Sequence, residues 1–74
     1  MKAGDAINDI LREQERSQRS LALELGVSPQ TISERLLGDG SVRVDTLVDM
    51  AHALDYKVML LPKDAKASGY ELNH

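Results

Sequence analysis

The stretch "LALELGVSPQTISERL", residues 21–36, decides the fold of this chain. Leu21 and Leu25 lie four residues apart on one side of a short helix. Gly26 is expected to end that helix, because glycine adopts left-handed backbone readily. Ser28 caps the next helix, whose first residue is a proline, where a missing N–H is tolerated. The stretch therefore predicts two short helices joined by a tight turn.

Helical patterns flank this pair on both sides. Residues 5–15 carry apolar side chains at spacings of three and four, which predicts a first helix. Ser17 is the expected cap of the second helix, over residues 18–25, and the third helix stops before Gly38. A broad apolar stripe over "VDTLVDMAHALD", residues 44–55, predicts a fourth helix.

A different pattern follows the fourth helix. The run "YKVMLLP", residues 56–62, contains β-favouring Tyr and Val and is bounded by Asp55 and a proline, which predicts one strand. Residues 63–74 are polar and weakly patterned, so we expect a loose tail there. The expected fold is all-α, one domain of four to five helices with a short C-terminal strand over residues 1–62.

This strand has no neighbour among the expected elements. A lone strand leaves its backbone groups unpaired, and four short helices offer no sheet for it to join. The same strand from a second copy would supply an antiparallel neighbour across a two-fold axis. The sequence therefore predicts a homodimer whose contact uses Tyr56, Val58, Met59, Leu60 and Leu61.

Length and composition limit the possible functions. The chain has 74 residues and no cysteine, which excludes disulfides and thiolate metal sites and favours the reducing cytoplasm. No stretch approaches the roughly 20 apolar residues of a membrane span, and the N-terminus lacks the pattern of a signal peptide. We therefore expect a cytoplasmic protein that does not associate with membranes.

The sequence also argues against catalysis and metal binding. His52 and His74 have no clustered carboxylates at ligand spacing, so neither indicates a metal site. The serines lack a recognisable nucleophile motif, and a domain of this size has little room for a substrate pocket. We predict neither an enzyme nor a cofactor.

The small residues of residues 21–36 suit one arrangement. Gly26 permits a sharp bend, Val27 fills the space beneath it, and Ala22 lets two helices cross closely, as in a helix-turn-helix. The segments "SQRSLALELGVSPQTISERLLGDG" and "VDTLVDMAHAL" resemble the lambda-repressor and Cro class, or XRE-like helix-turn-helix domains, over about residues 6–54. The trailing "DYKVMLLPK" is similar to members with a C-terminal strand.

This resemblance implies a DNA-binding transcriptional regulator, expected to be a repressor. Its third helix would lie in the major groove of double-stranded DNA, and its second helix would cross the backbone. The base contacts implied by the resemblance are Ser28, Gln30, Thr31, Ser33, Glu34 and Arg35. The implied phosphate contacts are Gln18, Arg19, Ser41 and Arg43.

Side-chain chemistry fits this placement, with two departures from the family pattern. Glutamine can pair bidentately with adenine, and glutamate can accept a hydrogen bond from the cytosine amino group. Pro29 stands where relatives often carry a polar base reader. Arg35 stands where many relatives bury an aliphatic residue, and the sequence leaves open whether it reaches a base or a phosphate.

The distribution of charge bears on the DNA hypothesis. A net charge of −3 argues mildly against nucleic acid, because most of that affinity comes from neutralising phosphates. Residues 16–43, however, hold four arginines against three acidic residues, and the acidic surplus lies on both sides of them. We therefore expect weak non-specific binding, with useful affinity only when two subunits bind an inverted repeat together.

Two classes of function stay open. The first is the DNA-binding regulator. The second is an antitoxin-like or other protein-interaction module on the same fold, which would hold a toxin or another protein and bind DNA secondarily. Net acidity and two leucines off the inward rows, Leu23 and Leu37, favour the second class. The intact turn, Gln18 and the polar face of the third helix favour the first, which we rank ahead.

Overall fold

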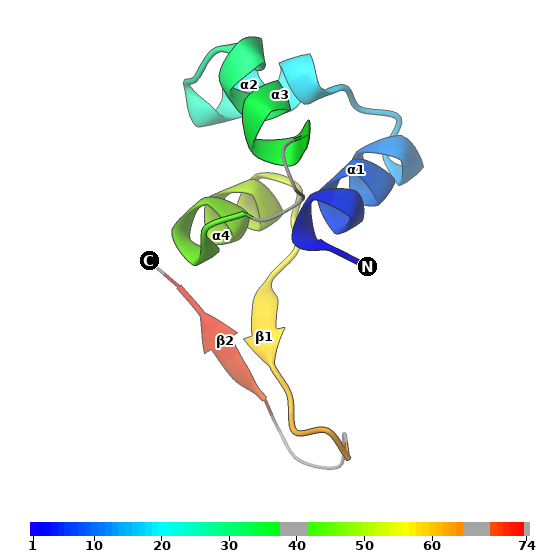
Figure 1. Ribbon diagram of the computed structural model, residues 1–74, viewed down its shortest axis with the longest axis vertical. Helices are drawn as coiled ribbons and strands as arrows, with labels where there is room; N and C mark the ends of the chain where they lie inside the picture. Colours follow the sequence, from blue (N-terminus) through cyan, green and yellow to red (C-terminus); the bar gives the residue numbers. More distant parts are fainter. Residues whose placement is uncertain (38–41, 65–68, 74) are drawn as a thin grey trace.

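The computed structural model describes residues 1–37, 42–64 and 69–73 (Figure 1). Within those ranges it holds four helices and one two-stranded antiparallel sheet, and no helix there has the length and apolar character to span a membrane. The elements in chain order are α1 (Ala3–Glu13), α2 (Gln18–Leu25), α3 (Pro29–Leu37), α4 (Val44–Ala53), β1 (Val58–Leu60) and β2 (Tyr70–Leu72). The mainly helical fold expected from the sequence is confirmed.

The bounds of α1 differ slightly from the predicted residues 5–15. The backbone N–H of Lys2 donates to Asp5 Oδ2 at 3.2 Å, so the first turn closes around this carboxylate before the apolar stripe begins. At the other end Glu15 has a φ of 55°, which no α-helix contains. The helix therefore ends before this residue.

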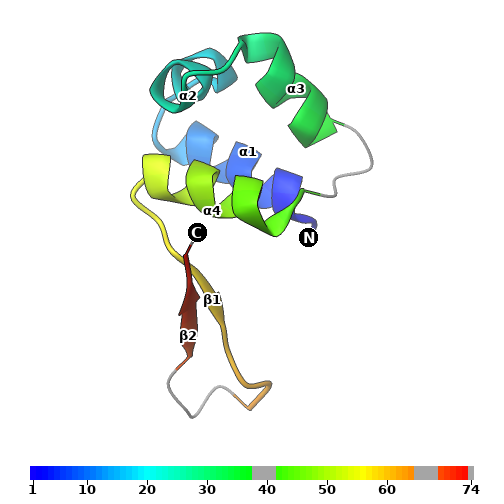
Figure 2. The same ribbon diagram turned by 90° about the vertical axis from the view of Figure 1, so that its left-hand side faces the viewer.

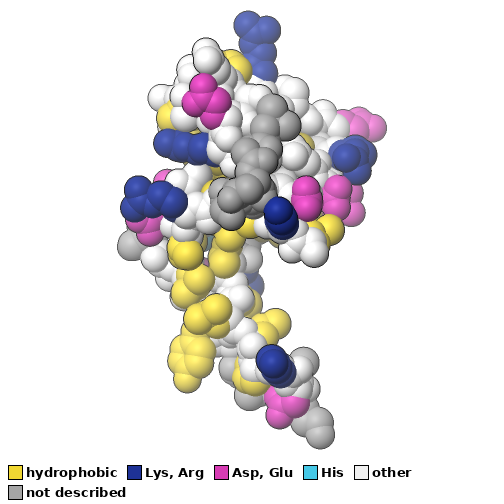
Figure 3. Space-filling model, viewed as in Figure 1, with side chains coloured by type: hydrophobic (Ala, Val, Ile, Leu, Met, Phe, Trp, Pro, Cys, Tyr) yellow, Lys and Arg dark blue, Asp and Glu magenta, His cyan; other side chains and the backbone are white. Residues whose placement is uncertain are grey.

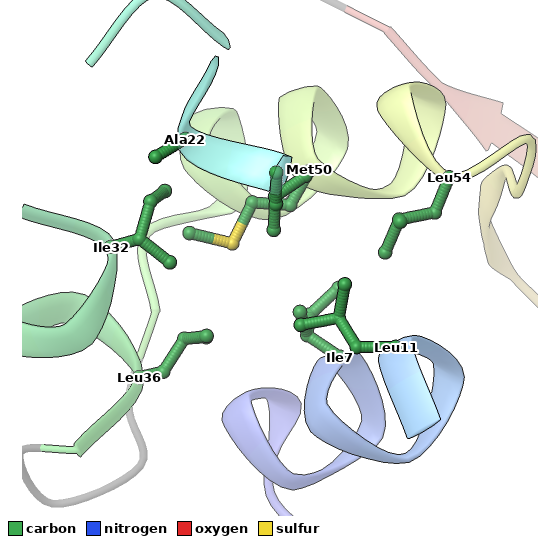
Figure 4. Packing of buried hydrophobic residues seen from close by; sticks show 8 residues of the cluster. Ile7, Leu11, Ala22, Ile32, Leu36, Met50 and Leu54 are labelled. Carbon is green, nitrogen blue, oxygen red and sulfur yellow. The ribbon is translucent and has the colours of Figure 1, made fainter. Parts of the chain in front are cut away.

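The core lies between the α1–α4 pair and the α2–α3 pair (Figures 2 and 4). Each helix contributes the side chains of one face, as the spacings of three and four predict. The buried cluster consists of Ile7, Leu11, Leu21, Ala22, Ile32, Leu36, Met50 and Leu54. Ala22 is fully buried, which agrees with a small residue where α2 and α3 pack closely.

The segment between α1 and α2 closes the C-terminal end of α4. Gln14 Nε2 donates to the Leu54 carbonyl at 2.9 Å, and an Arg16 guanidinium nitrogen donates to the Ala53 carbonyl at 3.2 Å. These carbonyls belong to the last turn, where a helix has no partners of its own to offer. Arg16 also lies 3.4 Å from Glu24 of α2, so one side chain links α2 to the end of α4.

The turn between α2 and α3 has the predicted form. Ser17 caps α2 by accepting a hydrogen bond from the Ser20 backbone N–H at 3.1 Å. Gly26 ends the helix with a φ of 71°, and the next N–H, that of Val27, donates to the Ala22 carbonyl at 3.0 Å. The left-handed residue turns the chain sharply enough for α3 to pack against α2.

Replacing Gly26 with alanine should lower the free energy of unfolding by about 1–2 kcal/mol, because an L-residue is strained in left-handed backbone. A Cβ at this position would meet nothing within 4 Å, so the whole effect comes from the backbone. Chemical denaturation followed by circular dichroism measures it. Asparagine, which tolerates this conformation, should lose less; equal losses for Gly26→Ala and Gly26→Asn would contradict the explanation.

The C-terminal end of the chain differs from the prediction. β1 pairs with β2, with Val58 opposite Leu72 and Leu60 opposite Tyr70. The strand therefore has a neighbour in its own chain, and its expected isolation is wrong. The expectation of a loose tail over residues 63–74 is also wrong for Tyr70–Leu72, which form β2.

Close approach of the two chain segments explains part of this pairing. Gly69 precedes β2, and a Cβ there would lie 2.5 Å from Leu61 Cδ2 and 2.7 Å from the Leu60 carbonyl oxygen. A glycine is required for the returning chain to approach β1 so closely. Strand β1 is also shorter than the predicted residues 56–62.

Candidate nucleic-acid interface

The start of α3 is held by a hydroxyl cap. Ser28 Oγ accepts a hydrogen bond from the Thr31 backbone N–H at 3.1 Å and lies 2.8 Å from Thr31 Oγ1. Pro29 follows as the first residue of the helix. Two of the predicted base contacts, Ser28 and Thr31, thus bond to each other and fix the first turn.

The remaining turns of α3 have an apolar side and a polar side. Ile32 and Leu36 are buried in the core. Among the other predicted base contacts, Ser33 is half-buried, and the exposed side chains are Gln30, Glu34 and Arg35. One helix with its cap thus contains the whole predicted set, and the face away from the core is polar.

Gln30 and Glu34 form a pair on that face. Gln30 Nε2 donates to Glu34 Oε1 at 3.2 Å, a contact between residues one helical turn apart. The side-chain amide nitrogen of glutamine carries two hydrogens. Gln30 therefore keeps one side-chain N–H and its side-chain carbonyl oxygen for another partner. Adenine requires one donor and one acceptor from glutamine. The pair can therefore hold Gln30 in place without using up its base-reading groups.

Gln18, a predicted phosphate contact, is bound within the domain. Its Nε2 donates to Asn8 Oδ1 of α1 at 2.9 Å, and the side chain is half-buried at the start of α2. The second hydrogen on this nitrogen is chemically able to reach a phosphate. Sequence reasoning missed Asn8, because a contact between different helices leaves no periodic signal.

The arginines predicted to contact the DNA are exposed. Arg19 lies on α2, and Arg43 stands at the N-cap position of α4, 3.8 Å from Asp45. Arg35 and Arg43 line an open depression beside the start of α4, together with Val42 and Thr46. The N-terminal end of a helix favours anions, so this part of the surface suits phosphate.

Ser41, the remaining predicted phosphate contact, lies outside the described residues.

A family model described as helix-turn-helix matches residues 7–61, from within α1 to just beyond β1. The chain belongs to the XRE, or lambda-repressor-like, helix-turn-helix family. No curated protein and no solved structure shows a significant match. This helix-turn-helix chain is therefore a DNA-binding regulatory protein, and α3 occupies the position of the family's recognition helix.

Proposed function

We propose that this helix-turn-helix protein is a sequence-specific transcriptional repressor that binds an inverted repeat as a homodimer. The polar face of α3 is the observation that carries the proposal. Burial of Ile32 and Leu36 holds one side of α3 against the core, and the bonded pair Gln30 and Glu34 lies exposed on its outer side. The protein would act in the cytoplasm of a prokaryotic or phage-infected cell, where its DNA lies.

The contacts divide into base readers and phosphate binders. We assign Gln30 and Glu34 to base edges, with Ser28, Thr31 and Ser33 supporting them along the helix. We assign Arg35 to phosphate, because its side chain lines the same depression as Arg43. Gln18, Arg19, Arg43 and Ser41 would complete the phosphate contacts from the neighbouring segments. Phosphate contacts set the register of a protein on DNA, whereas base contacts set its specificity.

The small positive charge of the helix-turn-helix region supports binding as a dimer. Residues 16–43 carry an excess of only one positive charge, so one domain gains little from phosphate neutralisation. Two domains joined on a two-fold axis would place their α3 helices in successive major grooves, about 34 Å apart. A repressor of this kind acts by occupying its site.

A second candidate function is an antitoxin-like module that holds another protein. Its support is exposed apolar surface away from the base-facing residues. Leu23 of α2 is 78% exposed, and β1 and the residue after it add Leu60 and Leu61. The side chain of Leu37 lies outside the described residues. Such a partner could be bound in addition to DNA.

Selection from a random DNA library with the purified protein tests the proposed function. We expect an enriched inverted repeat whose half-sites lie roughly 10 base pairs apart, centre to centre. Enrichment of single half-sites would contradict the dimer alone. A pool with no enriched sequence, from protein with an intact helical spectrum, would contradict sequence-specific binding and leave the protein-interaction module as the better explanation.

A further inference from the structure

Within the paired strands β1 and β2, one face of the C-terminal hairpin carries no charged residue. Residues directly opposite each other in an antiparallel pair lie on the same face of a sheet. The register therefore places two apolar pairs on one face, which we call the apolar hairpin face: Val58, Leu60, Tyr70 and Leu72. The other face carries Met59 opposite Glu71.

The apolar hairpin face is covered only near the helices. Val58 and Leu72, at the end next to α4, are half-buried. Leu60 and Tyr70 lie farther from the helical body and are 60% and 76% exposed. Figure 3 shows hydrophobic side chains along the hairpin, with charged side chains spread over the helices and at the far tip of the hairpin. Adjacent exposed apolar residues of this kind mark a contact surface, unlike an isolated leucine.

We propose that this face packs against the same face of a second copy of the chain. The proposal rests on the proposed function, which requires two joined domains, and it identifies the surface that joins them. It retains Val58 and Leu60 from the predicted dimer contact and adds Tyr70 and Leu72 of β2. Met59 lies on the opposite face, and the packing of Leu61 against the Gly69 position places Leu61 beside Met59.

Charge favours this face, rather than the helical surfaces, as the point of contact between two copies. The chain carries a net charge of −3, so two copies repel each other over much of their surfaces. Exposed acids lie on α1 and α4, among them Asp5, Asp45 and Asp49. The four residues of the apolar hairpin face are uncharged. Two copies that meet through this face therefore avoid the repulsion between their acidic surfaces.

The same reasoning disfavours pairing through the free edge of β2. A two-fold axis at the middle of this strand would set Glu71 directly opposite Glu71 of the second copy. Like charges directly opposite each other destabilise a strand pair. Packing through the apolar hairpin face leaves both carboxylates on the outside.

The position of the hairpin suits a DNA-binding dimer. Figures 1 and 2 both show α3 at one end of the molecule and the hairpin at the other. The longest dimension of the molecule is 38 Å, against 24 and 23 Å for the others. Contact between two hairpins on a two-fold axis therefore leaves both α3 helices uncovered and able to face one DNA duplex.

Multi-angle light scattering over a range of protein concentrations tests the proposal. We expect a dimer for the full chain at tens of micromolar. Leu60→Asp and, independently, Tyr70→Asp should each weaken dimerisation about 100-fold or more, because each would place a charge in both halves of the apolar contact. Leu61→Asp is the matched control, since Leu61 is 61% exposed but lies on the other face; it should change dimerisation only a few-fold.

A monomeric full chain would overturn the proposal and leave the face to a different protein. So would a Leu61→Asp effect as large as that of Leu60→Asp, which would indicate edge pairing, or dimers that persist in both Leu60→Asp and Tyr70→Asp. Circular dichroism confirms that each variant keeps its helices. Binding of a single half-site duplex separates this proposal from the proposed function. Monomeric variants should bind the half-site as the wild type does, whereas a dimeric wild type that binds no DNA would contradict the function only.

Discussion

Replacing Ile32 with alanine is expected to lower the free energy of unfolding by about 2–5 kcal/mol. Ile32 is fully buried, and Figure 4 shows it among Ala22, Leu36 and Met50, at the meeting point of three helices. Neighbours from three helices cannot all move in to fill the space left by the missing carbons. A loss of this size is a large part of the stability of a small domain.

Urea denaturation followed by circular dichroism measures the effect of Ile32→Ala. Gln30→Ala is the matched control, because it lies on the same helix but is exposed, and its effect should stay within about 0.5 kcal/mol. If Ile32→Ala cost no more than this control, the burial of α3 against the core would be contradicted. DNA binding should fall in parallel with the folded fraction.

Gln30→Ala should weaken binding to the selected site by about 1–3 kcal/mol, because it removes a proposed bidentate base contact. Binding to unrelated duplexes should stay nearly unchanged, since they offer no matched base at that position. Fluorescence anisotropy at fixed salt concentration measures both affinities. The ratio between the two sites is the informative quantity, because it separates base recognition from attraction to phosphate.

Gln18→Ala provides the contrasting variant. It removes a proposed phosphate contact, so it should weaken all sequences to the same extent. Asn8→Ala should resemble it more weakly, because Asn8 only orients the Gln18 amide. A Gln30→Ala protein that bound its selected site with wild-type affinity would show that Gln30 reads no base.

The helical part of the fold could be predicted because its signals are local. Ser17 caps the start of α2 and Gly26, in left-handed backbone, ends it. Both residues have the roles that the sequence predicted. The hairpin could not be predicted in this way. Tyr70–Leu72 is too short to show an alternating pattern, and its pairing with β1 depends on a close approach at Gly69.

The candidate site could also be predicted only in part. Residue types and helical spacing place Gln30, Glu34 and Arg35 on the exposed side of one helix, and the structure has them there. The side-chain partners could not be predicted from the sequence. The Gln18–Asn8 bond joins two helices, and the depression that Arg35 and Arg43 line combines a residue of α3 with residues at the start of α4.

The proposed function depends above all on the entry of α3 into the major groove. Titrating the ¹⁵N-labelled protein with the selected duplex and recording amide chemical shifts by NMR tests it most directly. We expect the largest changes at Ser28 and Gln30–Arg35, smaller changes at Gln18 and Arg19, and little change in β1 and β2 beyond that caused by dimerisation. Shifts concentrated on the hairpin or on α1, with Ser28–Arg35 unchanged, would contradict the entry of α3 into the groove.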